Sequence, residues 1–186
     1  MFAYEATRYD ASATVQGVIA NHRPCSVAGK APWSNVTADE AAAACAMIGT
    51  GWRLCTAAEW LDVCNGPSNT AFPYGATYNG AACVGYDYGS PAPVATGAAT
   101  LCVSDASPPA GAKAFDMSGN VKEWASDPTL TPPYQIRGGA YDIASFTVNS
   151  VQEAKGLQCD AFTPAPSVPV RLPSVGFRCC LTGQMP

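Results

Sequence analysis

The chain has 186 residues, of which 48% are hydrophobic and 13% charged, so residues 1–186 can form one domain around a single sizeable core. Its 10 basic and 14 acidic residues give a net charge of −4, and the basic residues are scattered singly. A nucleic-acid partner is disfavoured, because neutralising phosphates requires a positive face. Apolar runs stay well below the roughly 18–20 residues that cross a bilayer, so we expect no membrane insertion.

Nine cysteines favour an oxidising compartment, in which disulfides persist. The sequence therefore predicts a secreted, extracellular or cell-surface protein, with the periplasm as a further option. The alternative is a reduced cytosolic protein with buried thiols. Zinc is a weak candidate, because the chain has no C-x-x-C pair and its single histidine, His22, lies in a polar loop.

Two helices are expected in the first third of the chain. Thr37-Ala-Asp-Glu40 has the pattern of a capping box, and the Ala-rich run from Ala38 to Ile48 has strong helix propensity up to Gly49. Thr56-Ala-Ala-Glu59 repeats the capping pattern. The second helix is therefore predicted over Thr56–Cys64.

Short extended segments make up the other regular structure that the sequence predicts. Tyr4–Arg8 and Trp33–Val36 are candidate strands before the helices. After Asn65, glycine and proline recur every few residues, and only segments such as Gln135–Arg137 and Val175–Cys180 have the pattern of strands. Two early helices and a loop-rich remainder predict an α+β domain.

A tight turn between two carboxylates stands out in Ala114-Phe-Asp-Met-Ser-Gly-Asn-Val-Lys-Glu-Trp124. The side chains of Asp116 and Glu123 could converge with intervening carbonyls on one hard cation, and ligation by oxygen alone suits calcium. The alternative is a purely structural turn, in which Asp116 caps local amides and Trp124 fills the core.

This segment resembles the G-N-V-x-E-W signature of the formylglycine-generating-enzyme, or sulfatase-modifying-factor, family. Four further segments resemble its motifs in the same order: Arg53–Trp60 (R-L-P-T-E-A-E-W), Phe72–Gly75 (Y-P-W-G), Arg137–Ala140 (R-G-G-S) and Gly176–Arg178 (G-F-R). The resemblance runs from about Tyr4 to Cys180. It implies the family's variant of the C-type-lectin-like fold, with two helices, short strands and long loops stapled by disulfides. Family members carry further strand sequence before Tyr4, so we expect the chain to be part of a longer parent.

The resemblance also implies the ligands of a calcium ion. They are the side chain of Asp116, the carbonyls of Gly119 and Val121, and the carboxylate of Glu123. The family has a second site after Y-P-W-G. Asn79 and Asp87 are candidates for it, but their spacing does not align, and the second site stays open.

Two disulfides follow from the resemblance: Cys45 with Cys179, and Cys64 with Cys159. Cys83 and Cys102 are expected to close the middle loop. Cys25 with Cys55 is the fourth pair that we expect. Cys180 is then the ninth cysteine, whose partner could lie upstream of Met1, in another chain or nowhere.

The resemblance does not extend to the catalytic metal site. The family's enzyme oxidises a substrate cysteine with copper held by two thiolates in a C-x4-C spacing after R-G-G-S. The corresponding positions here are Ile143 and Val148, and Cys159 alone cannot supply two thiolates. Relatives that use iron need more imidazole than His22 provides. We therefore expect a chain without oxidase activity, with a metal-dependent thiol oxidase as the weakest alternative.

Two binding functions remain. The first is a non-catalytic, calcium-stabilised extracellular module that recognises a protein, peptide or glycan, or that self-assembles. Its contacts would come from the segment in place of the enzyme's active surface, where the candidates are Tyr141, Asp142, Ser145, Phe146 and Asn149. An ordinary buried strand and turn is the structural alternative for this segment.

The second is a diversified ligand-binding protein. Variable proteins generated with a reverse transcriptase use this fold and vary this C-terminal region, which here would be Tyr141–Val151. The Pro-rich run from Phe162 to Val170 could be a stiff arm that contacts a partner, or a rigid surface loop.

Overall fold

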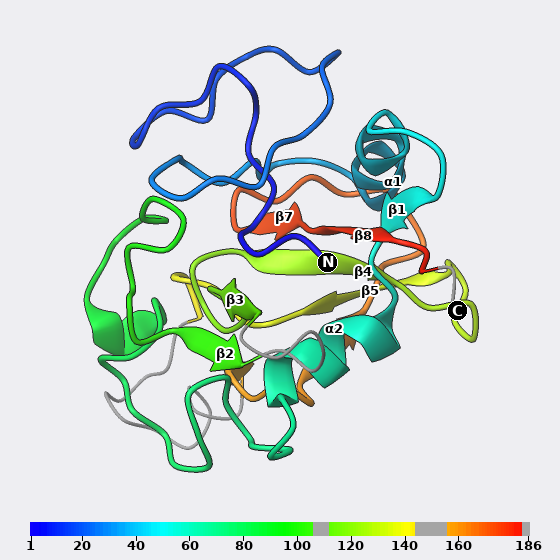
Figure 1. Cartoon of the computed structure of the whole chain (residues 1–186). Coiled ribbons are helices and arrows are strands. Elements are labelled where there is room, and N and C mark those ends of the chain that lie inside the picture. The colour runs from blue at the N-terminus through cyan, green and yellow to red at the C-terminus, as the bar shows by residue number, and fades with distance from the viewer. Residues whose placement is uncertain (106–111, 144–155, 184–186) are drawn as a thin grey trace.

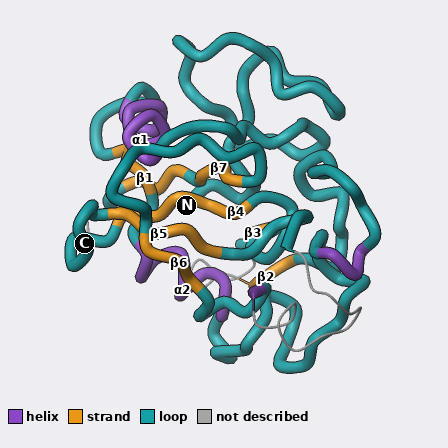
Figure 2. The backbone as a smooth tube through the Cα atoms, turned by 180° about the vertical axis from the view of Figure 1, so that it is seen from behind, coloured by secondary structure: helices purple, strands orange, loops and turns teal. Residues whose placement is uncertain are grey.

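Most of the backbone is loop rather than helix or strand (Figure 2). The computed structural model describes residues 1–105, 112–143 and 156–183. The helical elements are α1 (Ala38–Ala46), α2 (Ala57–Asn65) and the 3-10 turn η1 (Tyr86–Tyr88). The strands are β1 (Trp52–Leu54), β2 (Val103–Asp105), β3 (Lys113–Phe115), β4 (Lys122–Ser126), β5 (Tyr134–Arg137), β6 (Phe162–Pro164), β7 (Val175–Phe177) and β8 (Cys179–Leu181). The α+β class predicted from the sequence is confirmed.

Both helices begin at the predicted capping boxes. The Thr37 hydroxyl accepts from the backbone N–H of Glu40, whose carboxylate accepts from the Thr37 N–H at 2.9 Å. Thr56 and Glu59 make the same reciprocal pair at the start of α2. Each box satisfies two N–H groups that the first turn of a helix would otherwise leave without partners. Helix α1 ends at Ala46, two residues before the predicted end.

A four-stranded sheet in the order β6-β5-β4-β7 lies at the centre, with α1 and α2 on either side of it (Figure 1). Strand β4 pairs antiparallel with β5 and parallel with β7, which places Glu123 opposite Arg137 on one side and Gly176 on the other. The motifs around these three residues are therefore neighbours in space. Two-stranded pairs, β1-β8 and β2-β3, complete the described sheets.

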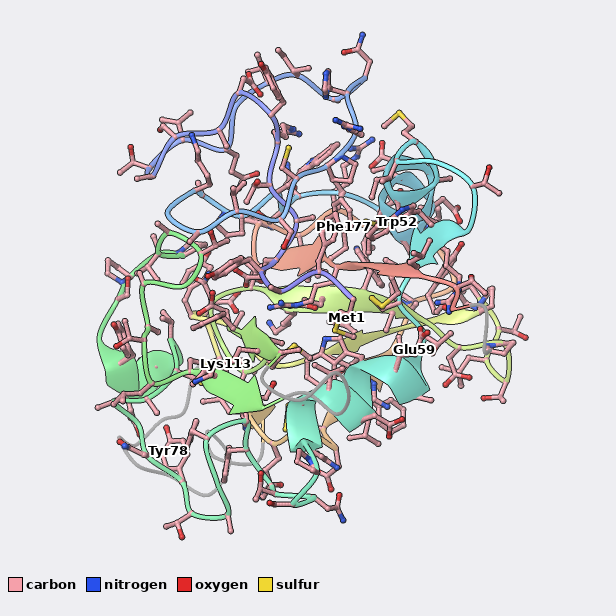
Figure 3. All side chains as sticks on the ribbon, viewed as in Figure 1. Met1, Trp52, Glu59, Tyr78, Lys113 and Phe177 are labelled. Carbon is pink, nitrogen blue, oxygen red and sulfur yellow. A yellow bond between two sulfur atoms is a disulfide. The ribbon has the colours of Figure 1, made fainter. Side chains whose placement is uncertain are left out.

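The largest cluster of buried side chains lies between α1 and the central sheet. It includes Trp33, Trp124 and Phe177, and the partly buried Trp52 packs against it. Figure 3 labels Phe177 and Trp52. The Trp33 and Phe177 rings meet edge to face, with 5.4 Å between their centroids, and the Trp124 indole N–H donates to the Val36 carbonyl. Within the described ranges, no helix is long and apolar enough to cross a bilayer.

Three of the expected disulfides are present: Cys45–Cys179, Cys64–Cys159 and Cys83–Cys102. The expected Cys25–Cys55 pair is wrong, because Cys55 is bonded to Cys180 and Cys25 is the free cysteine. The antiparallel pairing of β1 with β8 brings the residue after β1 close to Cys180. Adjacent strand residues point to opposite faces, so Cys179 and Cys180 reach different partners. Cys25 pairs by backbone with Thr7 in the N-terminal loop.

Candidate functional site

The turn from Asp116 to Glu123 adopts an unusual backbone conformation. Asp116 and Asn120 have positive φ angles of 57° and 58°, which the short polar side chains of Asp and Asn tolerate better than most. Gly119, with a φ of 74°, is fixed by space as well, because a Cβ there would lie 2.5 Å from the Val84 carbonyl oxygen. Its N–H donates to the Gly138 carbonyl at 2.6 Å. The turn is thus held between the Val84 loop and the Arg137-Gly-Gly turn.

Three carboxylates are buried around this turn, and Glu5 was not among the expected ligands. Glu5, Asp116 and Glu123 are at most 1% exposed. Glu5 accepts from the Asn120 side-chain amide at 2.7 Å and from the Val121 N–H at 3.1 Å. It lies in Tyr4–Arg8, where the structure has an isolated bridge at Thr7 in place of the predicted strand, more than 100 residues before the turn. A local sequence pattern cannot predict a hydrogen bond between residues so far apart in the chain.

Asp116 and Glu123 are bonded in different ways. One oxygen of Asp116 accepts from the Gly97 N–H at 2.6 Å, whereas Oδ1 is buried without a hydrogen-bond partner. Glu123 has both oxygens occupied: Oε1 accepts from Arg178 Nε at 2.7 Å and Oε2 from Trp60 Nε1 at 2.8 Å. Arg178 also donates to the carbonyls of Ala3 and Phe115.

Burial raises the carboxylate pKa values in this cluster. Burial raises the pKa of Asp116 to about 6 and that of Glu5 well above its usual range, where the Asp116 carboxylate adds to the effect. The pKa of Glu123 is also raised by burial, against the opposing effect of Arg178. Three carboxyl groups thus share one guanidinium, which leaves an excess of negative charge when all are ionised.

The expected calcium ligands fit this arrangement in part. Asp116 fits, because its Oδ1 is buried with no donor facing it. Glu123 fits less well, because Arg178 and Trp60 already occupy both of its oxygens. Among the described residues, no cluster of three or more His, Cys, Asp and Glu side chains is arranged to hold a metal ion. A cation here would therefore depend on Asp116 and main-chain oxygens more than on Glu123.

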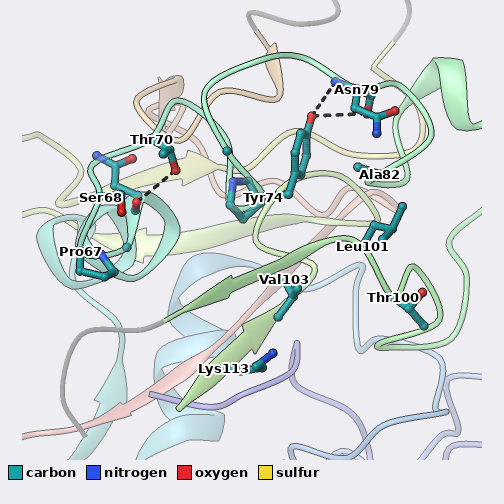
Figure 4. Close-up of a pocket in the computed structure, with 14 residues that line it drawn as sticks. Pro67, Ser68, Thr70, Tyr74, Asn79, Ala82, Thr100, Leu101, Val103 and Lys113 are labelled. Carbon is teal, nitrogen blue, oxygen red and sulfur yellow. Dashed lines mark hydrogen bonds between the residues drawn. The ribbon is translucent and has the colours of Figure 1, made fainter. Parts of the chain in front are cut away.

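The open second site involves a loop that is bonded within itself. Asn79 Oδ1 accepts from the Ala81 N–H at 3.1 Å, and Asp87 Oδ2 accepts from the Tyr78 hydroxyl at 3.0 Å. Tyr74 bonds both backbone groups of Asn79 on the wall of a cavity of about 570 Å³ (Figure 4). The polar groups of this loop thus stabilise the loop.

A second cavity, of about 350 Å³, lies at the Arg137-Gly-Gly turn. Ile143, the position that the resemblance assigns to the first copper thiolate, lines it together with Lys122, Arg137 and Phe162. No lining residue in the described part of the chain is a cysteine or a histidine. The cavity wall therefore combines basic side chains with apolar ones.

The expected contact surface is described only in part. Tyr141 is half-buried against the cluster around the Cys83–Cys102 bridge, and its N–H donates to the Asn120 carbonyl at 3.1 Å. Asp142 is exposed and forms an ion pair with Lys122 at 3.1 Å. Ser145, Phe146, Val148 and Asn149 lie outside the described residues.

Comparison with known proteins agrees with this arrangement. The family model of the sulfatase-modifying factor enzyme 1-like domain matches residues 4–182. The fold is similar to that of Treponema denticola variable protein 1, with a TM-score of 0.58 and 17% identity over 96% of this chain and 77% of that one. It is also similar to PvdO from Pseudomonas aeruginosa, with a TM-score of 0.51 and 20% identity over 88% of this chain and 69% of that one.

No curated protein sequence matches the chain. The similarity to the two solved structures shows a shared fold and leaves activity to be argued from the site. The family model covers nearly the whole chain, and four of the five motifs meet at Glu123, which pairs by backbone with Arg137 and Gly176 and accepts from the Trp60 side chain. The chain therefore belongs to the sulfatase-modifying factor enzyme 1-like family.

Proposed function

We propose that this chain is a non-catalytic recognition module of an oxidising compartment, and that it binds a protein, peptide or glycan partner beside the Arg137-Gly-Gly turn. The observation that carries the proposal is Ile143 on the cavity wall, at the position that the resemblance assigns to the first copper thiolate. An alkyl side chain cannot hold Cu(I), which prefers soft sulfur ligands. The basic and apolar side chains of the cavity wall are suited to contact with a partner.

The four disulfides support an extracellular or periplasmic setting for this module. They also tie long loops to a small sheet, so a rigid surface can be presented without extensive regular structure.

Calcium binding at the β4 turn is part of the proposal. It is supported by the buried Oδ1 of Asp116, which has no donor, and by the excess of carboxylates over guanidinium groups around it. A divalent cation would neutralise that excess, with the carbonyls of Gly119 and Val121 as further oxygen ligands.

A diversified ligand-binding protein is the second candidate. The similarity in fold to Treponema denticola variable protein 1 favours it. A near-identical template repeat beside the coding gene would support this candidate, and its absence would leave a fixed recognition module.

Binding and oxidase assays test the proposal together. We expect binding to at least one member of a glycan and peptide array, with loss of that binding in Asp142→Arg. Asp62→Arg is the matched control, because Asp62 is exposed on α2. Incubation with Cu(I) and a cysteine-containing peptide should yield no aldehyde by mass spectrometry. Aldehyde formation would overturn the non-catalytic assignment.

A further inference from the structure

Arg137 is a buried cation with few partners among the residues that the structure describes. Arg137 is 7% exposed. Its guanidinium carbon lies 5.8 Å from the centroid of the Trp60 ring and 5.5 Å from that of the Phe162 ring. Nη1 donates to the Cys159 carbonyl at 3.2 Å, whereas Nε has no hydrogen-bond acceptor. None of the ion pairs found among the described residues includes Arg137.

The acids near Arg137 in the described part of the chain are used elsewhere or are exposed. Asp127 is one of two described carboxylates that act on Arg137 through space, but its oxygens accept from Thr129 and Gln135. The other, Asp160, is exposed to solvent. Burial lowers the pKa of Arg137 because a charged group loses its hydration there. A buried charge of this kind is costly unless an opposite charge and hydrogen bonds compensate it.

The cavity at the Arg137-Gly-Gly turn offers the place for such a counter-charge. Arg137 and Lys122 both line it, in a chain with a net charge of −4. The Lys122 side chain is 26% exposed, and its Nζ forms an ion pair with Asp142. The apolar part of the wall comes from Ile136, Ile143 and Phe162. A guanidinium among apolar surfaces is suited to an anion that carries an apolar body.

We propose that this cavity binds an organic carboxylate with an apolar body, the carboxylate meeting Arg137 and the apolar body lying against Ile143 and Phe162. The inference rests on the proposed recognition function and names the chemical class of its ligand. A peptide C-terminus that follows an apolar residue and a free apolar acid share this chemistry.

Matched probes isolate the charge of the ligand. N-acetyl-phenylalanine and its neutral amide differ only at the carboxylate, so calorimetric titration of both reports what the anion contributes. We expect the acid to bind about tenfold or more tightly than the amide, the factor that a charge-assisted hydrogen bond can supply. Equal affinities for acid and amide, or binding of neither, would overturn the proposal.

Matched variants isolate the charge of the cavity. Ile143→Glu places a negative charge on its wall and should abolish binding of the acid, whereas Ile143→Gln, of similar size, should keep it. Lys122→Gln should weaken binding and Arg23→Gln, in an exposed loop away from the cavity, should not. Thermal melts verify that each variant is folded. Equal binding of the acid by Ile143→Glu and Ile143→Gln would place the anion elsewhere and refute the site.

The source of the carboxylate is tested with N-acetyl-Ala-Ala-Phe. Tighter binding of the tripeptide acid than of N-acetyl-phenylalanine indicates a peptide C-terminus, and equal or weaker binding indicates a free acid. Array ligands that require Asp142 but do not compete with the acid would leave the recognition function standing without this ligand class. Binding of the acid without any array ligand would support the cavity and count against the wider contact surface.

Discussion

Asp116 is a buried carboxyl group whose ionised form is destabilised by its surroundings. Its side chain is 1% exposed, one oxygen has no donor, and Glu5 and Glu123 add negative charge nearby. A carboxyl group in this position is stabilised by a proton or by a bound cation. The protonated form and the cation-bound form respond differently to pH and to calcium. The stability of one variant, measured under both conditions, distinguishes them.

Asp116→Asn should make the protein more stable at neutral pH in the presence of a chelator. The folded-state pKa of about 6 lies above the unfolded value of 3.8, so the folded state holds the proton more tightly. The stability that this provides is present below about pH 4 and is lost as pH rises through about 6. The difference between variant and wild type should therefore grow by roughly 1–3 kcal/mol from pH 4 to pH 8. Urea unfolding across this range measures it, and parallel curves would contradict it.

In the presence of calcium, the wild type should be more stable than Asp116→Asn. Adding calcium should raise the melting midpoint of the wild type and leave Asp116→Asn nearly unchanged, because the ion favours the ionised carboxylate. An identical wild-type midpoint with and without chelator would count against the calcium site.

Arg178 offsets part of the same buried charge. Its Nε pairs with Glu123 at 2.7 Å, and neither side chain is exposed. Arg178→Met should cost about 3–5 kcal/mol, because it leaves the Glu123 carboxylate buried without its counter-charge. Adding Glu123→Gln to this variant should recover part of the loss, since an amide oxygen can still accept from the Trp60 N–H. The double-mutant cycle is measured by chemical denaturation. A double variant less stable than Arg178→Met would contradict this account of the pair.

At the scale of elements, the two capping boxes differ in what surrounds them. The carboxylate of Glu40 also pairs with the exposed Arg171, whereas that of Glu59 accepts twice from Arg53, at 2.6 and 2.7 Å. The hydrogen bonds from Arg53 lower the pKa of Glu59 to about 2. Helix α2 is thus linked to β1 at its first turn.

Thr56→Ala should therefore destabilise the fold more than Thr37→Ala. Loss of an N-cap hydroxyl costs about 1 kcal/mol on average. At Thr56 the hydroxyl also bonds Glu59 Oε2 at 3.0 Å, so its loss disturbs the contact with β1 as well. Denaturation midpoints of the two variants measure the difference. A larger loss from Thr37→Ala would show that the Arg53 link contributes little.

Local signals explain which elements could be predicted from the sequence. The capping boxes specify helix starts within four residues, so both starts were predicted correctly. Ile143 lies on the wall of the cavity at the Arg137-Gly-Gly turn, and its match to the first copper thiolate stays a prediction. Glu5, by contrast, meets Asn120 across 115 positions, and the Cys55–Cys180 bridge depends on the β1-β8 register. Such partnerships are set by tertiary packing, which no local pattern encodes.

At the scale of the whole molecule, two bridges join the early elements to the last strand. Cys45–Cys179 spans 134 positions and Cys55–Cys180 spans 125. With the Cys64–Cys159 bridge intact, either of them closes a loop of about 30–40 residues in the unfolded chain, which contributes about 4 kcal/mol in the loop-closure account. Once one of the two bridges is closed, however, the other closes a loop of only about 11 residues, which contributes about 3 kcal/mol.

The stability costs of removing the two bridges should therefore be non-additive. Cys45→Ser with Cys179→Ser, or Cys55→Ser with Cys180→Ser, should each cost about 3 kcal/mol, because the remaining bridge still joins the ends. Removing all four cysteines should cost about 7 kcal/mol, roughly 1 more than the sum, since the loop outside the Cys64–Cys159 bridge is then open.

The Cys83–Cys102 bridge is the matched control for this coupling. It closes a separate loop of 19 positions, so its removal should cost about 3 kcal/mol whether or not the terminal bridges are intact. Urea unfolding of the single and combined variants measures each cost, with non-reducing peptide mapping to verify the remaining pairs. If the costs of removing the two terminal bridges simply add, the bridges constrain different parts of the unfolded chain. That outcome would contradict the prediction, because Cys179 and Cys180 are adjacent in the sequence.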